Sequence, residues 1–194
     1  FLKWPLLTIE IRPLSCNLCR YFLIVSFEIS LTISSENKII KNYDALNDFY
    51  FKSVEEDISP TNQIQIEIDN EKVNEYKGDG LIISTPTGST GYSLSCGGPV
   101  LTPNVNSLVI TPIAPHNLNA RPLVIPDDTE ITLKVSGREE QYLVSLDSRI
   151  TSVTNETLLK IEKTSFEINM VAFNEEGFLK TIRKKLLWGE DRRN

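Results

Sequence analysis

The chain has 194 residues, of which 40% are hydrophobic and 24% are charged, and its formal net charge is −6. This length is enough for one sizeable domain with its own core. The acidic balance argues against a nucleic-acid or anionic-membrane surface, because both favour basic patches. Three cysteines do not suggest a disulfide framework, so a reducing, cytoplasmic setting is expected. No apolar run reaches the roughly 20 residues that span a bilayer.

The N-terminal part is the least readable. Residues 21–27 are apolar and predict a buried strand, and no signal-peptide cleavage pattern follows them before Glu28. Cys16 and Cys19 have C-x-x-C spacing, but a zinc site needs about four ligands and the remaining candidates are far away in the sequence. We therefore expect no metal site there.

Alternating apolar and polar residues predict a series of strands farther along the chain. Strands are expected at residues 64–69, 129–135, 142–146, 158–161 and 166–171, with short core strands at 108–111 and 123–125. A turn is expected at 70–71 and a hairpin loop at 137–140. Strands therefore outnumber helices in the expected fold.

Two helices are predicted. The first is short and covers residues 92–96, with the Thr90 hydroxyl as its N-cap. The second covers about residues 175–187, because apolar residues recur at four-residue spacing and basic residues occupy the last turns. Gly189 is expected to end this helix. The fold class is therefore mainly β (α+β), with one β-rich domain at residues 42–194 behind a less readable segment at 1–41.

The stretch from Gly78 to Pro99 is crowded with Gly, Ser, Thr and Pro, and its only charged side chain is Asp79. A phosphate-binding P-loop is disfavoured, because that loop needs a lysine and none follows before Lys134. A dinucleotide fingerprint is rejected, because position 83 is Ile and the stretch enters a strand. Two interpretations remain. One is an ordinary turn-rich loop, and the other is a site for neutral polyols such as ribose, which glycines let the backbone approach closely.

Residues 79–99 read DGLIISTPTGSTGYSLSCGGP, which strongly resembles the signature of the NAD kinases. One fixed position differs, because Gly91 stands where the family usually has alanine. Residues 45–48 resemble the family's Ala-Leu-Asn-Glu, with Asp48 one methylene shorter than the usual glutamate. Further similar segments are 111–124, 145–149 and 178–189, so the resemblance covers roughly residues 43–194. A lipid-kinase relative is more distant, because the signature points to the dinucleotide branch.

The resemblance implies the stacked-sheet, NAD-binding C-terminal domain of an ATP- or polyphosphate-dependent kinase that makes NADP. It implies that Asn47 and Asp48 hold the adenine-side ribose and that Asp79 contacts the nicotinamide side. It also implies an adenosine pocket lined by Thr87, Thr90, Gly91, Tyr92 and Ser95, with Ala114 and His116 near the ligand. Without the signature, each of these residues would be interpreted as an ordinary turn, packing or loop residue.

NAD kinases also carry a Gly-Gly-Asp-Gly loop in an N-terminal α/β domain, whose aspartate acts as the base on the ribose 2′-hydroxyl. Residues 1–42 contain no match to it. We therefore expect this chain to hold the acceptor side of the site, with no catalytic residue, no metal ligand and little transfer by itself. Mg²⁺ would accompany ATP or polyphosphate.

Two functions stay open at this point. The chain is either an NAD kinase or its C-terminal part, or a non-catalytic NAD(P)-binding module that has lost the donor domain. Family members are commonly dimers or tetramers, so a homo-oligomer is expected, with no nucleic-acid or membrane partner.

Overall fold

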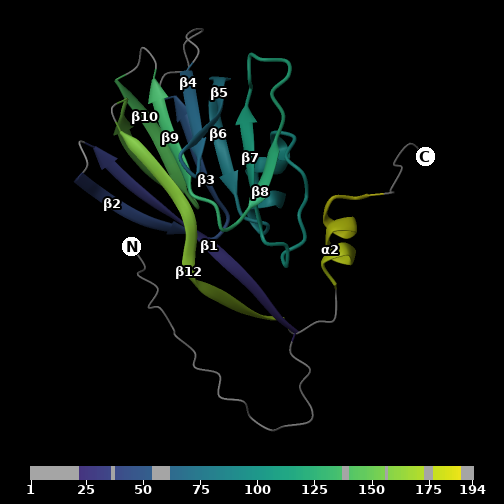
Figure 1. Ribbon diagram of the computed structural model, residues 1–194. Helices are drawn as coiled ribbons and strands as arrows, with labels where there is room; N and C mark the ends of the chain where they lie inside the picture. The colour runs from purple at the N-terminus through teal and green to yellow at the C-terminus, as the bar shows by residue number, and fades with distance from the viewer. Residues whose placement is uncertain are drawn as a thin grey trace.

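The computed structural model describes residues 22–35, 38–53, 62–136, 140–155, 157–172 and 177–188. Within these residues, twelve strands form two antiparallel six-stranded sheets (Figure 1). Sheet A has the order β2 (Lys38–Ala45), β1 (Phe22–Ser35), β12 (Leu158–Ala172), β9 (Ile131–Ser136), β4 (Asn62–Ile68) and β5 (Glu71–Gly78). Sheet B has the order β11 (Arg149–Thr154), β10 (Gln141–Leu146), β3 (Asp48–Ser53), β6 (Gly80–Ser84), β7 (Ser107–Ile113) and β8 (Leu123–Pro126). The mainly β prediction is confirmed.

The core lies between the two sheets and follows from strand alternation. In β9, Ile131 and Leu133 are buried in the core cluster, whereas Lys134 between Leu133 and Val135 is exposed. In β3, Phe49 and Phe51 belong to the same cluster, and the Phe51 ring packs on Tyr142 at 5.0 Å between ring centroids. Each sheet therefore has one face toward the core and one outward face.

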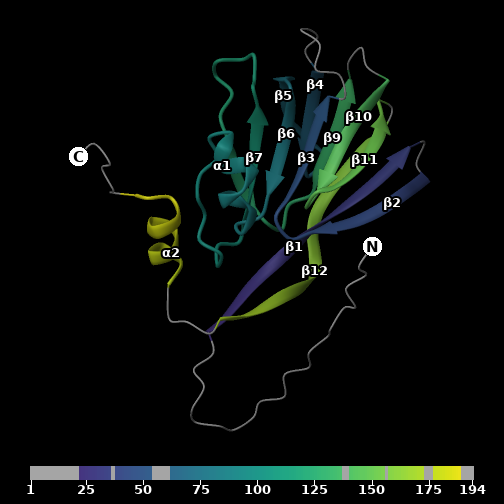
Figure 2. The same cartoon turned by 180° about the vertical axis from the view of Figure 1, so that it is seen from behind.

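One strand prediction is wrong. Residues 158–161 and 166–171 are not two strands, because β12 runs without a break from Leu158 to Ala172. Its partner β1 is almost as long and pairs with it from Phe22 opposite Ala172 to Ser34 opposite Leu158, with one register shift after Phe27. The two long strands extend past the rest of the molecule as a ribbon in both views (Figures 1 and 2). This long antiparallel pairing is not readable from either strand alone.

The short helix is confirmed, but its predicted cap is wrong. Helix α1 covers Tyr92–Ser95, and Thr90 instead ends a 3₁₀ turn, Gly88–Thr90, with its hydroxyl donating to the Thr87 carbonyl at 3.3 Å. Gly91 occupies the N-cap position and has no side chain to cap the helix. The carboxylate of Asp48, on another strand, lies beside this helix N-terminus, 3.6 Å from where a Cβ on Gly91 would be, and the Tyr92 N–H lowers its pKa. Tertiary packing thus brings a carboxylate to the helix end where a local cap was expected.

Helix α2 covers Phe178–Lys185, inside the predicted range, with Arg183, Lys184 and Lys185 in its last turn. The predicted stop at Gly189, the loop residues 137–139 and both N-terminal cysteines lie outside the described residues. Sheet A includes residues on both sides of the predicted boundary at 42, and that boundary stays a prediction. In the part of the chain that the structure describes, no helix is long and apolar enough to cross a membrane.

Candidate functional site

The site is built on the outward face of sheet B. Because side chains alternate along a strand, β3 turns Phe49 and Phe51 to the core and places Asp48, Tyr50 and Lys52 on the opposite face. Helix α1 lies beside β6 and β7, as seen from behind the molecule (Figure 2). The strand face thus supplies the floor of a site and the signature loop supplies a wall.

A cavity of about 610 Å³ opens between that floor and that wall. Its lining residues come from four segments: Asn47, Asp48, Tyr50 and Lys52; Thr87 and Gly88; Thr90, Gly91 and Tyr92; and Asp147, Ser148 and Ile150. A cavity of this size is in the range that holds small ligands and cofactors. Most of its lining groups are hydroxyl, amide or carboxyl groups, which suit a ligand rich in hydroxyls.

Several hydroxyls of the signature are buried and fold the loop itself. The Ser89 hydroxyl donates to the Pro86 carbonyl at 2.6 Å and accepts from the Leu101 N–H at 3.0 Å. Ser93 and Thr111 share a hydrogen bond of 2.8 Å, which ties α1 to β7. All of these hydroxyls belong to residues with no exposed area. They are therefore scaffold groups, and the signature hydroxyls left for a ligand are those at the cavity.

The signature loop also fixes residues 46 and 47. Thr85 donates its hydroxyl to the Leu46 carbonyl at 2.7 Å, and its N–H donates to the Asn47 carbonyl at 3.0 Å. Gly88 packs so closely on Asn47 that an added Cβ would lie 2.0 Å from the backbone carbonyl oxygen of Asn47. Only glycine fits this contact without movement of one backbone. The Asn47–Asp48 segment and the signature are thus one packed unit.

Carboxylates dominate the charge of the cavity lining. Burial raises the pKa of Asp48, the neighbouring charge of Asp147 raises it further, and the Tyr92 N–H opposes both effects. Among the described residues that line the cavity, Lys52 is the only lysine or arginine. The cavity therefore has an acidic end at Asp48 and one basic side chain farther along β3.

Tyr92 provides the aromatic surface of the wall. Its ring meets the Tyr50 ring edge-on, at 5.5 Å between centroids and 81° between planes, and the residue remains 39% exposed. Burial raises the pKa of the Tyr92 hydroxyl, and Cys96, Tyr50 and Asp79 raise it further. The phenol is thus neutral at physiological pH and suits contact with a flat, uncharged ring.

The structure brings together six of the ten site residues that the resemblance implies. Lining the cavity are Asn47, Asp48, Thr87, Thr90, Gly91 and Tyr92, whereas Asp79, Ser95, Ala114 and His116 do not line it. Asp79 is exposed at the β5–β6 junction, and its N–H donates to the Ile113 carbonyl at 3.1 Å. The exposed residues Ala114 and His116 follow on the same side, where the His116 N–H donates to the Lys77 carbonyl at 2.8 Å. Ser95 is exposed at the end of α1.

Sequence reasoning missed several lining residues. Tyr50 and Lys52 carried a usable signal, because they follow Asp48 at two-residue spacing in a strand. The Asp147–Ser148 turn was visible only as a family-like segment, and nothing local indicates that it meets Asn47. Ile150 carried no signal at all.

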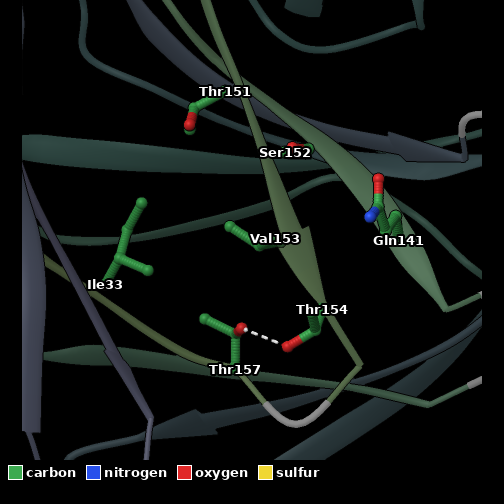
Figure 3. Close-up of a pocket in the computed structure, with 7 residues that line it drawn as sticks. All are labelled: Ile33, Gln141, Thr151, Ser152, Val153, Thr154 and Thr157. Atoms are coloured by element: carbon green, nitrogen blue, oxygen red, sulfur yellow. Dashed lines mark hydrogen bonds between the residues drawn. The ribbon is translucent and has the colours of Figure 1, made fainter.

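A second, smaller cavity of about 190 Å³ lies at β11, beside Ile33 of β1 (Figure 3). Its described lining residues carry hydroxyl, amide and apolar groups and no charge, and the Thr154 and Thr157 hydroxyls share a hydrogen bond of 3.2 Å. It offers less space and weaker recognition chemistry than the cavity on the outward face of sheet B. That larger cavity remains the candidate site.

Comparison with known proteins agrees with this geometry. Residues 46–173 match the model of the ATP-NAD kinase C-terminal domain. The chain is 73% identical over 136 residues to the NAD kinase of Flavobacterium johnsoniae, covering 69% of this chain and 46% of that protein. It is 60% identical over 182 residues to the NAD kinase of Flavobacterium psychrophilum, covering 89% of this chain and 62% of that protein. The chain thus spans about half the length of the curated relatives that it matches.

Two solved structures share the fold. Yeast NADH kinase complexed with NADH superposes with a TM-score of 0.80 at 24% identity, covering 88% of this chain and 52% of that one. An NAD kinase from Archaeoglobus fulgidus in complex with ATP gives 0.66 at 26% identity, covering 84% and 60%. The family model covers most of the chain and the relatives agree with it. The chain therefore belongs to the NAD kinase family, and its described part has the fold of that family's C-terminal domain.

Proposed function

We propose that the protein is an NAD kinase, which transfers a phosphoryl group from ATP or polyphosphate to the 2′-hydroxyl of NAD, and that this chain supplies the NAD-binding side. The observation that carries the proposal is the cavity in which Asn47 and Asp48 face the signature wall at Thr87–Tyr92. The names of the relatives support the kinase activity, and the bound NADH and ATP of the two solved structures support the two ligand classes.

The lining groups have the chemistry for a dinucleotide. The side chains of Asn47 and Asp48 accept hydrogen bonds from the hydroxyls of the adenine-side ribose. Tyr92 offers its ring to a flat base, and Thr90 adds a hydroxyl beside it. Lys52 faces the same space with the positive charge that a pyrophosphate attracts.

The residues outside the cavity lining extend the proposed site past Tyr92. The charge of Asp79 is one of the causes that raise the pKa of the Tyr92 hydroxyl. We assign Asp79 to the nicotinamide side of the ligand, with Ala114 and His116 next to it. Ser95 continues the adenosine wall from the end of α1.

The donor side is not assigned to residues of this chain. Among the described residues, no group of three or more His, Cys, Asp or Glu side chains could hold a metal ion. In this proposal Mg²⁺ accompanies the ATP or polyphosphate donor. Transfer needs donor and acceptor placed together, so we assign the base and the donor contacts to a Gly-Gly-Asp-Gly segment elsewhere in the protein. Assembly as a cytoplasmic homodimer or homotetramer is part of the same proposal.

The test is calorimetric titration of NAD into the purified chain and into Asp79→Ala. Saturable binding that the substitution weakens supports the acceptor site. An assay for NADP formation with ATP or polyphosphate then separates a kinase from a module that only binds NAD(P). The absence of binding at millimolar NAD would contradict the assignment of this cavity.

A further inference from the structure

We propose that Asp147 is a positioning residue of the NAD site, whose carboxylate fixes the backbone of the Asn47–Asp48 segment. The inference rests on the proposed function, because that segment is the one assigned to the ribose. Asp147 was not among the residues implied by the resemblance, and its role follows from contacts between two distant parts of the chain.

Three consecutive backbone N–H groups converge on this one carboxylate. Oδ2 accepts from the Leu46 N–H at 2.6 Å, and Oδ1 accepts from the N–H groups of Asn47 and Asp48 at 3.0 and 3.2 Å. In return, the Asp147 N–H donates to the Asp48 carbonyl at 3.2 Å. Hydrogen bonds to an ionised acceptor are stronger than neutral ones. The direction of the Asn47 and Asp48 side chains therefore depends on an acid 100 residues away from Asn47.

The β10–β11 hairpin holds Asp147 in place. Asp147 and Ser148 form its two-residue turn, with φ values of 45° and 71° in the left-handed region that suits such hairpins. The next residue, Arg149, donates to the carbonyls of Asp44 and Leu146, so it joins the hairpin to the end of β2. The hairpin thus contacts residues 44–48 through two charged side chains, the Asp147 carboxylate in its turn and the Arg149 guanidinium just after the turn.

A second hairpin of the chain provides a matched comparison. Asp69 and Asn70 form the turn between β4 and β5, with φ values of 49° and 66°. The Asp69 carboxylate accepts one N–H, from Glu130 at 2.9 Å, and it does not line the cavity. Both turns have two residues with positive φ and begin with an aspartate. What distinguishes Asp147 is that its N–H partners belong to the site.

Asp147 also adds charge beside Asp48. Burial is the larger cause of the raised pKa of Asp48, and the Asp147 carboxylate is the second. The other titratable groups that line the cavity are Tyr50 and Lys52 from β3 and Tyr92 from α1. Replacing Asp147 by asparagine keeps the shape, removes the charge and leaves one oxygen in place of two. The pKa of Asp48 then falls while its backbone loses part of its support.

The experiment compares Asp147→Asn with Asp69→Asn in the 194-residue chain, by calorimetry with NAD from neutral to acidic pH. We expect Asp147→Asn to weaken NAD binding about tenfold at neutral pH, as for lost hydrogen bonds to a charged group. We expect the midpoint of the acid loss of binding to move to lower pH. Asp69→Asn is expected to change neither quantity. A purely structural role would lower the melting temperature and leave both the NAD affinity and the midpoint in place.

Amide hydrogen exchange gives a readout that does not depend on NAD. Exchange at Leu46, Asn47 and Asp48 is expected to be faster in Asp147→Asn than in wild type or Asp69→Asn. If Asp147→Asn does not fold, Asp147→Glu replaces it, because it keeps the charge and displaces the carboxylate. Asp147→Glu is expected to weaken binding without moving the midpoint.

The outcomes separate the two claims. Wild type that binds no NAD, with protected amides at residues 46–48, contradicts the proposed function and the inference with it. Wild type that binds NAD no better than Asp147→Asn, with equal exchange at residues 46–48, overturns the inference and leaves the proposed function intact.

Discussion

The two sheets have the same alternation of side chains along their strands, but the charged side chains on their outward faces have different partners. On sheet A, charged side chains pair with each other: Lys134 lies 2.6 Å from Glu67, and Lys160 lies 2.7 Å from Glu130. On sheet B, the Asp147 carboxylate instead accepts backbone N–H groups, including that of Asp48, at the edge of a cavity. Charged side chains that pair with each other on a surface do not form a binding site. A carboxylate that fixes the backbone beside an open cavity instead supports a ligand site.

The signature loop accounts for the difference between the two outward faces. It covers the outward side of β6 and β7, where Ile82 and Val109 have no exposed area, and it leaves the outward side of β3 open. The difference shows that a conspicuous sequence motif can act first as a scaffold. Each of the following substitutions tests whether binding depends on the sheet B face alone.

The largest effect is expected from Gly88→Ala. The added Cβ would lie 2.0 Å from the backbone carbonyl oxygen of Asn47, so the Asn47–Asp48 segment and the signature loop must move apart. We expect NAD binding to be lost and the free energy of unfolding to fall by about 1–3 kcal/mol, as for overpacking. Calorimetry and thermal unfolding measure the two effects. Gly177→Ala is the control, because no atom of the described residues lies within 4 Å of its added Cβ, and it should leave NAD affinity unchanged.

Tyr92→Ala is expected to weaken NAD binding by about tenfold, because the wall loses its aromatic surface. Tyr92→Phe keeps the ring and its edge-on contact with Tyr50, and should retain most of the affinity. The two dissociation constants, measured side by side, check this. Equal losses in both variants would assign the role to the hydroxyl and contradict ring contact.

Asp48 links binding and stability to pH with opposite signs. Its pKa is raised by burial and by Asp147, so the folded state holds this proton more tightly than the unfolded chain. Its contribution to the free energy of unfolding is therefore present at low pH and is lost as pH rises through the raised pKa. NAD binding needs the carboxylate as an acceptor and should instead fall as pH drops through that pKa.

Asp48→Asn separates the two effects. We expect it to weaken NAD binding, to remove the acid loss of binding, and to raise the free energy of unfolding at neutral pH. Calorimetry and denaturant unfolding across pH check all three. A variant that lost stability at neutral pH would show that the Asp48 carboxylate stabilises the fold by more than its burial costs.

The smallest effects compare one lysine from each face. Lys52→Gln should weaken NAD severalfold, in a salt-dependent way, and leave adenosine binding unchanged, because adenosine carries no phosphate. Lys134→Gln breaks the pair with Glu67 on sheet A, should cost at most about 1 kcal/mol, and should not alter NAD affinity. Titrations with NAD and adenosine check both. Equal losses for the two ligands in Lys52→Gln would rule out phosphate contact.

Local patterns predicted most strands, because alternation records which face of a sheet is buried. The same patterns missed the continuity of β12, since its length depends on pairing with β1. The Thr90 cap failed for a similar reason, because Gly91 takes the N-cap position and the carboxylate beside it comes from Asp48 on another strand. Strand ends and helix caps that depend on residues distant in the sequence cannot be predicted from local sequence patterns.

The candidate site divides in the same way. Asn47, Asp48 and the signature were readable as a motif, and the structure sets them around one cavity. The motif could not show which hydroxyls are buried, as at Ser89 and Ser93, because spacing does not reveal what a side chain packs against. Nor could it show Asp147, whose contact with residues 46–48 exists only in the folded chain.

The most direct test of the account is an amide hydrogen-exchange footprint of the chain with and without saturating NAD. The account predicts slower exchange with NAD at residues 46–52, 87–92 and 147–150, which surround the cavity. It predicts no change in β4 or β9 of sheet A. Protection confined to sheet A, or saturable binding that leaves residues 46–52 and 87–92 unprotected, would contradict the claim that the outward face of sheet B binds NAD.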